Sequence, residues 1–331
     1  MKWQKALAEK LLFFLTMTIY LIRIPRLHVL LPTLVEKLQS VFKDSPGGIF
    51  VTSPFGFKFH IDDNFSLQTL LTSCERATLR LLFVLSKHTN TFINVGANFG
   101  YYALAIKRTN LNKNVIAFEP QNHNFIKLKS NALENDLSIE INQVAVADFS
   151  QKERKLFKYR DGNPGMFTLS PIEEREYIFD SLVETISLDE YFKQEIPKSL
   201  ILMDIEGGEV LALKGATRLL KSRSLFICEV NSLMLQAYSS SSKELFELFK
   251  EVDYLIYWID ERGVLAVQPH DCPPIHEVIL GRENGANYLF LPVEDCEILE
   301  KNLKESLGFS FGIKTLLELS TFHLPRLSKR S

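Results

Sequence analysis

Residues 91–102 have the composition of a ligand-binding turn at the start of a helix. An apolar run is followed by a turn that contains Gly96 and Gly100, and then by a pattern typical of a helix. Glycines let a backbone approach a ligand closely, and the first turn of a helix offers unpaired N–H groups. A second apolar run ends at Glu119. This arrangement predicts a Rossmann-like unit that binds an adenosine, with the carboxylate of Glu119 on the ribose hydroxyls.

The spacing of the two glycines indicates which adenosine cofactor is bound. A dinucleotide fingerprint needs G-x-G-x-x-G, but Asn98 and Tyr101 occupy its second and third glycine positions. The remaining G-x-x-x-G suits a cofactor without a pyrophosphate, and S-adenosylmethionine is the obvious candidate. The same spacing disfavours a nicotinamide-dependent dehydrogenase. A tight turn in some other α/β protein is the alternative that this motif alone leaves open.

A second cluster of residues that could do chemistry follows the apolar run 200–203. Asp204, Glu206 and Glu209 come together at a glycine turn before a helix. The helix dipole favours carboxylates in a first turn, which accounts for Glu206 and Glu209 without a functional role. Asp204 ends the predicted strand, where it could hold the ammonium group of the cofactor or accept a proton from a substrate hydroxyl. Glu229, at the end of the next strand, is the alternative base.

The elements that position these residues alternate between strand and helix along the chain. Short continuous apolar runs are typical of strands that are buried on both faces of a sheet. Their alternation with helical patterns predicts a doubly wound, mostly parallel sheet, whose ligands bind at the carboxyl ends of the strands. The predicted strands are 91–95, 115–119, 139–144, 200–204, 225–230, 254–259 and 287–291, and the predicted helices are 101–108, 122–135, 208–221 and 243–251.

We expect four segments in the chain, with the predicted sheet in the third. Residues 1–45 form an apolar, helical extension, 46–90 a lead-in of strands and a helix that caps the core, 91–300 the cofactor-binding domain, and 301–331 a helix and a polar tail. Within the extension, 11–22 is uncharged and flanked by lysines and arginines. It is shorter than the roughly 20 residues of a spanning helix, so peripheral membrane contact and a packed helix both remain open.

Composition narrows the possible partners. Net charge is −2 and the sequence has no long basic run, which argues against a nucleic-acid partner. Four widely spaced cysteines indicate reduced thiols and therefore a cytoplasmic protein. This location is compatible with peripheral contact between residues 11–22 and the membrane. Residues 270–277 contain two histidines and a cysteine, but their spacing matches no zinc pattern, and we expect a solvated loop and no metal.

Several of these motifs, in this order, resemble the FkbM-type methyltransferases. The resemblance covers roughly residues 80–260 and rests on the ordered set, since no single motif is decisive. The matching segments are Asn94–Tyr102, Ala117–Pro120, Val144–Asp148, Ser187–Phe192, Asp204–Glu209 and Leu213–Ala216.

The resemblance implies a class I methyltransferase fold, with a seven-stranded, mostly parallel sheet and helices on both faces. It implies S-adenosylmethionine as cofactor and methylation of a hydroxyl on a sugar, a glycan or a secondary metabolite. Glu119 is implied to bind the ribose, Ala145 and Val146 to flank the adenine, and Asp204 to lie near the methionine. The full implied set of cofactor-binding residues is Asn94, Gly96, Ala97, Asn98, Gly100, Glu119, Ala145, Val146 and Asp204.

Two positions depart from the residues that the family usually has. Asn94 replaces an aspartate, and Leu202 replaces a lysine. Asparagine keeps hydrogen-bonding groups but brings no charge for the cofactor's ammonium group. The alternative function is therefore a weakly active or inactive protein of this fold that serves as a membrane-associated scaffold. For an active enzyme, we expect segments 46–90, 150–185 and 232–285 to shape the acceptor pocket.

Overall fold

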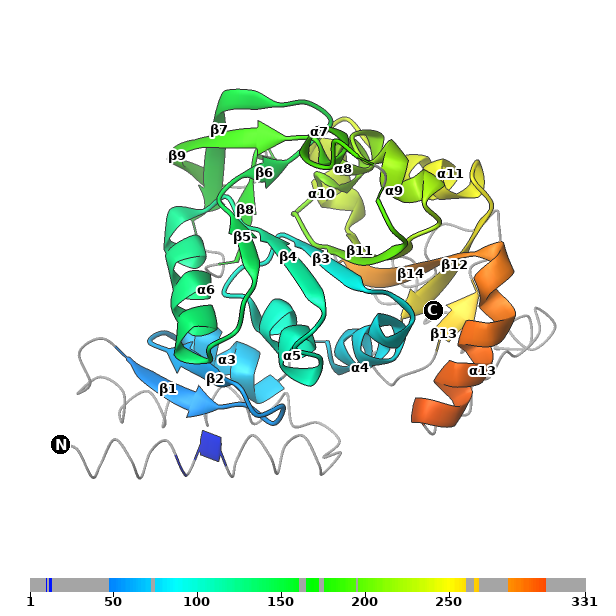
Figure 1. Cartoon of the computed structure of the whole chain (residues 1–331). Coiled ribbons are helices and arrows are strands. Elements are labelled where there is room, and N and C mark those ends of the chain that lie inside the picture. The colour runs from blue at the N-terminus through cyan, green and yellow to red at the C-terminus, as the bar shows by residue number, and fades with distance from the viewer. Residues whose placement is uncertain are drawn as a thin grey trace, which may run out of the picture.

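The centre of the molecule is an eight-stranded sheet with helices on both faces (Figure 1). The computed structural model describes residues 48–259 except 73–74, 161–164, 173–175 and 195, together with 265–267, 285–307, Lys10, Leu12 and Phe13. Across the sheet the strands are β13 (Leu265–Val267), β12 (Tyr254–Ile259), β14 (Ala286–Pro292), β11 (Leu225–Val230), β10 (Ser199–Met203), β3 (Thr91–Val95), β4 (Asn114–Phe118) and β5 (Glu140–Asn142).

The seven predicted strands are all present, and the predicted fold class is confirmed. Strands β5, β4, β3, β10 and β11 pair in parallel, whereas β14 runs antiparallel to both of its neighbours, β11 and β12. Every residue of β3 and β10 is buried, as expected for central strands that are covered on both faces. β13, which the sequence did not predict, adds an eighth strand at the edge, antiparallel to β12.

The two faces of the sheet are covered by different sets of helices. Neighbouring residues of β3 point to opposite faces, so Ile93 packs in one apolar cluster and Phe92 in the other. The Ile93 side is covered by α7 (Leu188–Tyr191), α8 (Glu209–Lys214), α9 (Thr217–Lys221), α10 (Ser232–Ala237) and α11 (Ser242–Lys250). The Phe92 side is covered by α4 (Arg76–Leu85), α5 (Tyr101–Thr109), α6 (Asn122–Glu134) and α13 (Cys296–Leu307).

One predicted helix is wrong as a single element, because 208–221 folds as the separate helices α8 and α9. At the break, a Cβ on Gly215 would lie 2.4 Å from the carbonyl oxygen of Ala147, so the chain passes too close for a side chain. The carboxylate of Asp189 then caps the second helix, where it accepts the N–H groups of Thr217 at 3.0 Å and Arg218 at 2.9 Å. These contacts between distant segments end one helix and begin the other.

The lead-in segment forms a further layer beneath α5 and α6 (Figure 1). It contains the antiparallel pair β1 (Ile49–Thr52) and β2 (Lys58–Ile61), followed by α3 (Asn64–Thr72). Leu12 is fully buried in the same apolar cluster, which supports packing of this residue against the lead-in. Apart from Leu12 and Phe13, the segment 11–22 lies outside the described residues. Within the described part of the chain, no helix has the length and apolar character to cross a membrane.

The polar segment after β5 forms a second, four-stranded sheet that the sequence did not predict. Its order is β6 (Ala145–Val146), β9 (Tyr177–Ile186), β7 (Gln151–Tyr159) and β8 (Phe167–Thr168). The long strands β7 and β9 pair antiparallel, and Leu156 and Val183 are buried against Ala145. Much of the segment 150–185, which was expected to help shape the acceptor pocket, therefore forms β-structure paired with β6.

Candidate functional site

The predicted glycine loop joins β3 to α5 in a geometry that requires left-handed backbone. Gly96, Asn98 and Gly100 all have positive φ, at 79°, 50° and 85°. The N–H groups of Gly96 and Ala97 both donate to the carbonyl oxygen of Phe118, at 3.0 and 2.9 Å. The loop is thereby held against the end of β4, next to Glu119.

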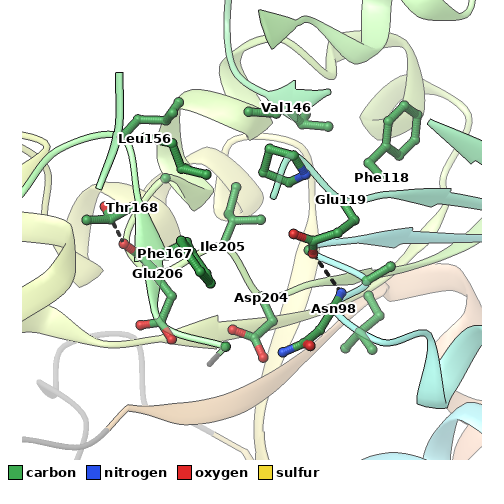
Figure 2. A pocket seen from close by; sticks show the side chains of 18 of the residues that line it. Asn98, Phe118, Glu119, Val146, Leu156, Phe167, Thr168, Asp204, Ile205 and Glu206 are labelled. Atoms are coloured by element: carbon green, nitrogen blue, oxygen red, sulfur yellow. Dashed lines mark hydrogen bonds between the residues drawn. The ribbon is translucent and has the colours of Figure 1, made fainter. Parts of the chain in front are cut away.

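Both carboxylate oxygens of Glu119 accept backbone N–H groups. One accepts from Asn98 at 2.8 Å, across the glycine loop (Figure 2). The other accepts from Gln121 at 2.9 Å. The side chain is only 5% exposed, and burial raises the pKa of Glu119 to about 7 although these hydrogen bonds favour the charged form. The loop after β3 and the acid after β4 thus form one connected unit, as the sequence predicted.

Asp204 immediately follows β10 beside this unit. Because Met203 pairs with Cys228 of β11, the next residues, Asp204 and Glu229, lie side by side, close enough for their carboxyl groups to share a hydrogen bond. Burial raises the pKa of Asp204, while the hydrogen bond from Glu229 acts in the opposite direction. The pKa of Glu229 is raised well above its ordinary value by burial and then by the charge of Asp204. Because like charges this close resist double ionisation, burial and mutual repulsion favour one proton shared between the two carboxyl groups.

Glu209 holds the turn that follows Asp204. One of its carboxylate oxygens accepts the N–H groups of Ile205 at 3.0 Å and Gly207 at 3.4 Å. The side chain is 1% exposed, and burial raises the pKa of Glu209 to about 7. Between these residues, Glu206 adopts a left-handed φ of 54°. The Glu209 carboxylate therefore holds the turn in place, and the turn keeps the Asp204 and Glu206 side chains at the cavity wall.

These groups meet at a cavity of about 310 Å³ at the carboxyl ends of β3, β4 and β10. Figure 2 shows an apolar end near Leu156 and Val146, a carboxylate end near Asp204 and Glu206, and Glu119 to one side between them. Of the predicted site residues, those that line the cavity are Gly96, Ala97, Asn98, Glu119, Ala145, Val146 and Asp204, and those that do not are Asn94, Gly100 and Glu229.

The charge of the cavity wall is one-sided. Among the described residues that line it there are four acids and no lysine, arginine or histidine. In the part of the chain that the structure describes, no group of histidine, cysteine, aspartate and glutamate side chains could hold a metal ion. The histidine-containing loop 270–277 lies outside that part. Such a wall suits a ligand that carries positive charge and disfavours a pyrophosphate.

The two departures from the family's usual residues are neighbours in the sheet. Asn94 of β3 is the direct partner of Leu202 of β10. Leu202 lines the cavity at 2% exposure, whereas Asn94 is 1% exposed and does not line it. An aspartate and a lysine at these positions would stand side by side, so the chain lacks both members of an opposite-charge pair. Loss of one member alone would leave a buried charge without a partner, which is costly, whereas loss of both members leaves none.

Several cavity residues were not identified from the sequence. The lead-in supplies Phe65, Thr69 and Glu75, and the Glu75 carboxylate accepts a hydrogen bond from the hydroxyl of Tyr102 at 2.9 Å. The second sheet and the residue after α10 supply further wall residues, namely Leu156, Phe167, Thr168, Leu169 and Tyr238. Only their segments had been assigned to the pocket, because these residues belong to no strand–glycine–acid pattern.

The raised pKa of Glu119 predicts a dependence of stability on pH. The folded protein holds this proton up to about pH 7, whereas the unfolded chain releases it near pH 4.5. The contribution of Glu119 to the free energy of unfolding is therefore fully present below pH 4.5 and is lost as pH rises through 7, by at most about 3 kcal/mol. Urea titrations at pH 5 and pH 8 should show a smaller decrease for Glu119→Gln than for the wild type, and equal decreases would contradict the assignment.

The strand order and the position of the cavity define the class of protein. Five parallel strands, a reversed β14 and a cavity at the ends of β3, β4 and β10 form the class I methyltransferase fold. Residues 94–256 match the family model of the methyltransferase FkbM domain. This part of the chain is thus an FkbM-type methyltransferase domain with S-adenosylmethionine as its cofactor, and the resemblance inferred from the sequence motifs is confirmed.

Several of the solved structures similar to the chain are methyltransferases. An O-methyltransferase from Bacillus cereus, in complex with SAH, has 10% identity and a TM-score of 0.37 over 77% of this chain and 88% of that one. A SAM-dependent O-methyltransferase from Thermotoga maritima has 13% identity and a TM-score of 0.35 over 77% and 81%. Precorrin-6y C5,15-methyltransferase from Geobacter metallireducens has 8% identity and a TM-score of 0.33 over 66% and 87%. The comparison with curated proteins gives no match.

The cavity fits this cofactor. S-adenosylmethionine carries a sulfonium and an ammonium group, and the acid-lined end offers carboxylates to both. The amide oxygen of Asn98 is buried at the cavity without a hydrogen-bond partner among the described residues, as expected of a group whose partner is a ligand. Glu119 stands where the ribose of an adenosine cofactor binds in Rossmann-like units.

Proposed function

We propose that the protein transfers a methyl group from S-adenosylmethionine to a hydroxyl of a sugar, a glycan or a secondary metabolite. The observation that supports a hydroxyl acceptor is the Asp204–Glu229 pair at the acid-lined end of the cavity. A hydroxyl is a poor nucleophile until a base takes its proton, and a carboxylate of raised pKa accepts a proton better than an ordinary one. An acceptor that is already a strong nucleophile would not need this pair.

The cofactor supplies an electrophilic methyl group, so the protein has to align an acceptor and remove its proton. In this proposal Asn98 and Glu119 orient the cofactor, and Asp204 accepts the proton of the acceptor hydroxyl at its carboxylate. In the same proposal, Glu229 carries the proton that the pair shares and donates it in a hydrogen bond to Asp204, which favours the ionised form of Asp204. Glu229, which the sequence offered as an alternative base, then acts as a positioning residue, since it does not line the cavity.

Two measurements test the proposal. In the first, calorimetry with S-adenosylmethionine should show binding that Glu119→Ala loses and that NAD does not reproduce. In the second, transfer of a labelled methyl group to sugars and glycans should give a product that resists mild base. An O-methyl ether survives that treatment, whereas a methyl ester is hydrolysed. A base-labile product would contradict a hydroxyl acceptor, and a folded protein that binds no cofactor would support the scaffold alternative.

A further inference from the structure

A buried lysine joins the lead-in segment to the rest of the site. Lys127 lies on α6, the helix above the lead-in (Figure 1), and its side chain is only 3% exposed. Its ammonium group forms ion pairs with Asp62 and, at 3.6 Å, with Asp63, the two residues that precede α3. A lysine is rarely buried unless its charge is paired, and here two carboxylates of the lead-in pair it. The mechanism proposed above does not use this group.

The same ammonium group lies against the glycine loop. Its nitrogen is 3.9 Å from the centre of the Phe99 ring, which is a cation–π contact. Phe99 is 2% exposed and lines the cavity. It directly follows Asn98, whose N–H donates to Glu119. Lys127 therefore contacts the loop next to the residue that binds the ribose-site carboxylate.

The ion pair also holds the start of α3, which supplies another part of the cavity wall. The Asp63 carboxylate accepts the N–H of Ser66 at 2.6 Å and so caps this helix. Burial raises the pKa of Asp63, but the hydrogen bonds from Ser66 and the charge of Lys127 outweigh it and hold the pKa below its usual value. Two residues after Asp63, Phe65 lines the cavity and packs edge-on against Phe99, with 5.6 Å between the ring centres.

A second side chain of α6 connects the same two segments. Asn131 lies four residues after Lys127, on the same side of the helix, and is fully buried. Its amide nitrogen donates to the carbonyl oxygen of Phe99 at 2.9 Å, and its amide oxygen accepts the N–H of His60 in β2 at 2.9 Å. The glycine loop and the lead-in are therefore both attached to one face of α6.

We propose that Lys127 is a positioning residue for the cofactor. Its ion pairs with Asp62 and Asp63 hold Phe99, and with it the glycine loop, in the geometry that binds S-adenosylmethionine. Lys127 does not line the cavity, so it acts through Phe99. The family model matches residues 94–256, and the lead-in that supplies both carboxylates precedes that range. Cofactor affinity thus depends on a segment outside the matched domain. The proposal rests on the cofactor and not on the nature of the acceptor.

Calorimetry with S-adenosylhomocysteine tests this role, because the Kd of the folded protein is measured separately from its stability. Lys127→Met keeps the apolar stem of the side chain but removes the ammonium group. Two neighbouring carboxylates then lose their cation, and the Phe99 ring loses a contact on one face. We expect the Kd to rise about tenfold and amide exchange in residues 96–100 to become faster.

Neutralising the carboxylates tests the ion pair itself. Asp62→Asn keeps the shape of the side chain and weakens the pair, so it should raise the Kd by a smaller factor than Lys127→Met. Adding Asp62→Asn and Asp63→Asn to Lys127→Met should restore part of the affinity, because no unpaired charge remains and asparagine still caps α3. A triple variant that binds no better than Lys127→Met would overturn the role of the ion pair.

Lys113→Met is the matched control. Lys113 is also buried, and its ammonium group donates to the backbone carbonyl oxygens of Thr89 and, at 2.6 Å, Ser86. It immediately precedes β4, at the opposite end of the strand from the cavity, and does not line it. Lys113→Met should lower the melting temperature but leave both the Kd and the exchange of residues 96–100 unchanged.

The outcomes separate this proposal from a general effect on stability and from the assignment of the cofactor. Folded Lys127→Met with the wild-type Kd and exchange would overturn the proposal, as would an equal rise of the Kd in Lys113→Met. If Lys127→Met does not fold, an unchanged Kd in Asp62→Asn overturns the proposal instead. Wild-type protein that is folded but does not bind S-adenosylhomocysteine would overturn the cofactor assignment together with this proposal.

Discussion

The Asp204→Asn variant is expected to transfer methyl groups about 10²- to 10⁴-fold more slowly than the wild type at saturating acceptor. Its Kd for S-adenosylmethionine should rise by less than about tenfold, because Glu119 and the glycine loop stay intact. Asparagine has nearly the shape of aspartate but cannot accept the hydroxyl proton of the acceptor. A large loss in kcat with a small change in Kd is therefore the signature of a base.

The pH dependence of the rate gives an independent test of the same role. Burial raises the pKa of Asp204, so its carboxylate becomes protonated at a higher pH than an ordinary aspartate. The wild-type rate should fall as the pH decreases through that raised pKa, since only the ionised form accepts a proton. The residual rate of Asp204→Asn should lack this decrease. A variant that keeps the wild-type rate and pH profile would show that Asp204 only positions the cofactor.

Glu229→Gln is the matched control for this prediction. The glutamine amide can still donate a hydrogen bond to Asp204, as the proposal requires of a protonated Glu229. We expect its rate to stay within about tenfold of the wild type, whereas Glu229→Leu, which has no donor, should lose more. If Glu229→Gln were as slow as Asp204→Asn, Glu229 itself would be the base.

The parts of the fold that depend on local sequence patterns could be predicted from the sequence. β3 and β10 are buried at every position and mostly apolar because both of their faces are covered, and such runs can be found without knowing what covers them. Glu119 and Asp204 follow directly from this, because each comes immediately after a strand whose carboxyl end faces the cavity. Sequence patterns are sufficient to predict the position of a residue when that position depends only on the strand that carries it.

The residues that were missed depend on contacts between distant segments. β7 and β9 carry many charged and exposed side chains, so their sequences resemble a polar loop, and only pairing with each other makes them strands. Phe167 lines the cavity because Tyr238, far along the chain, holds β8 there. Glu75 likewise lies next to Tyr102 only in the folded protein. No spacing rule within one segment contains this information.

The role of the loop glycines also differs from the one the motif suggests. The sequence motif predicts that they admit a ligand, but the folded chain itself occupies the space beside them. A Cβ on Gly96 would lie 1.9 Å from the carbonyl oxygen of Asp204, and one on Gly100 would lie 2.1 Å from a methyl carbon of Leu128. The Leu128 side chain can move, whereas the Asp204 carbonyl belongs to the backbone that holds the proposed base.

Gly96→Ala is therefore expected to lower the free energy of unfolding by about 4 kcal/mol. Alanine disfavours the left-handed φ at this position, and its Cβ would collide with the backbone of Asp204. Gly56→Ala separates the two causes. Gly56 has nearly the same φ, 78° against 79°, but the nearest atom to its added Cβ is 4.0 Å away. It should lose only the conformational part, about 1–2 kcal/mol, when both variants are unfolded in urea.

The difference between these two variants measures how tightly the glycine loop and the turn after β10 are packed together. The N–H of Asp204 donates to the carbonyl oxygen of Val95 at 3.0 Å, so moving Asp204 away from residue 96 would break the last bond between β3 and β10. Equal losses for the two variants would show that this backbone moves freely. A larger loss at residue 96, accompanied by loss of S-adenosylmethionine binding, would show that one close contact between backbones sets both the stability of the sheet and the position of the base.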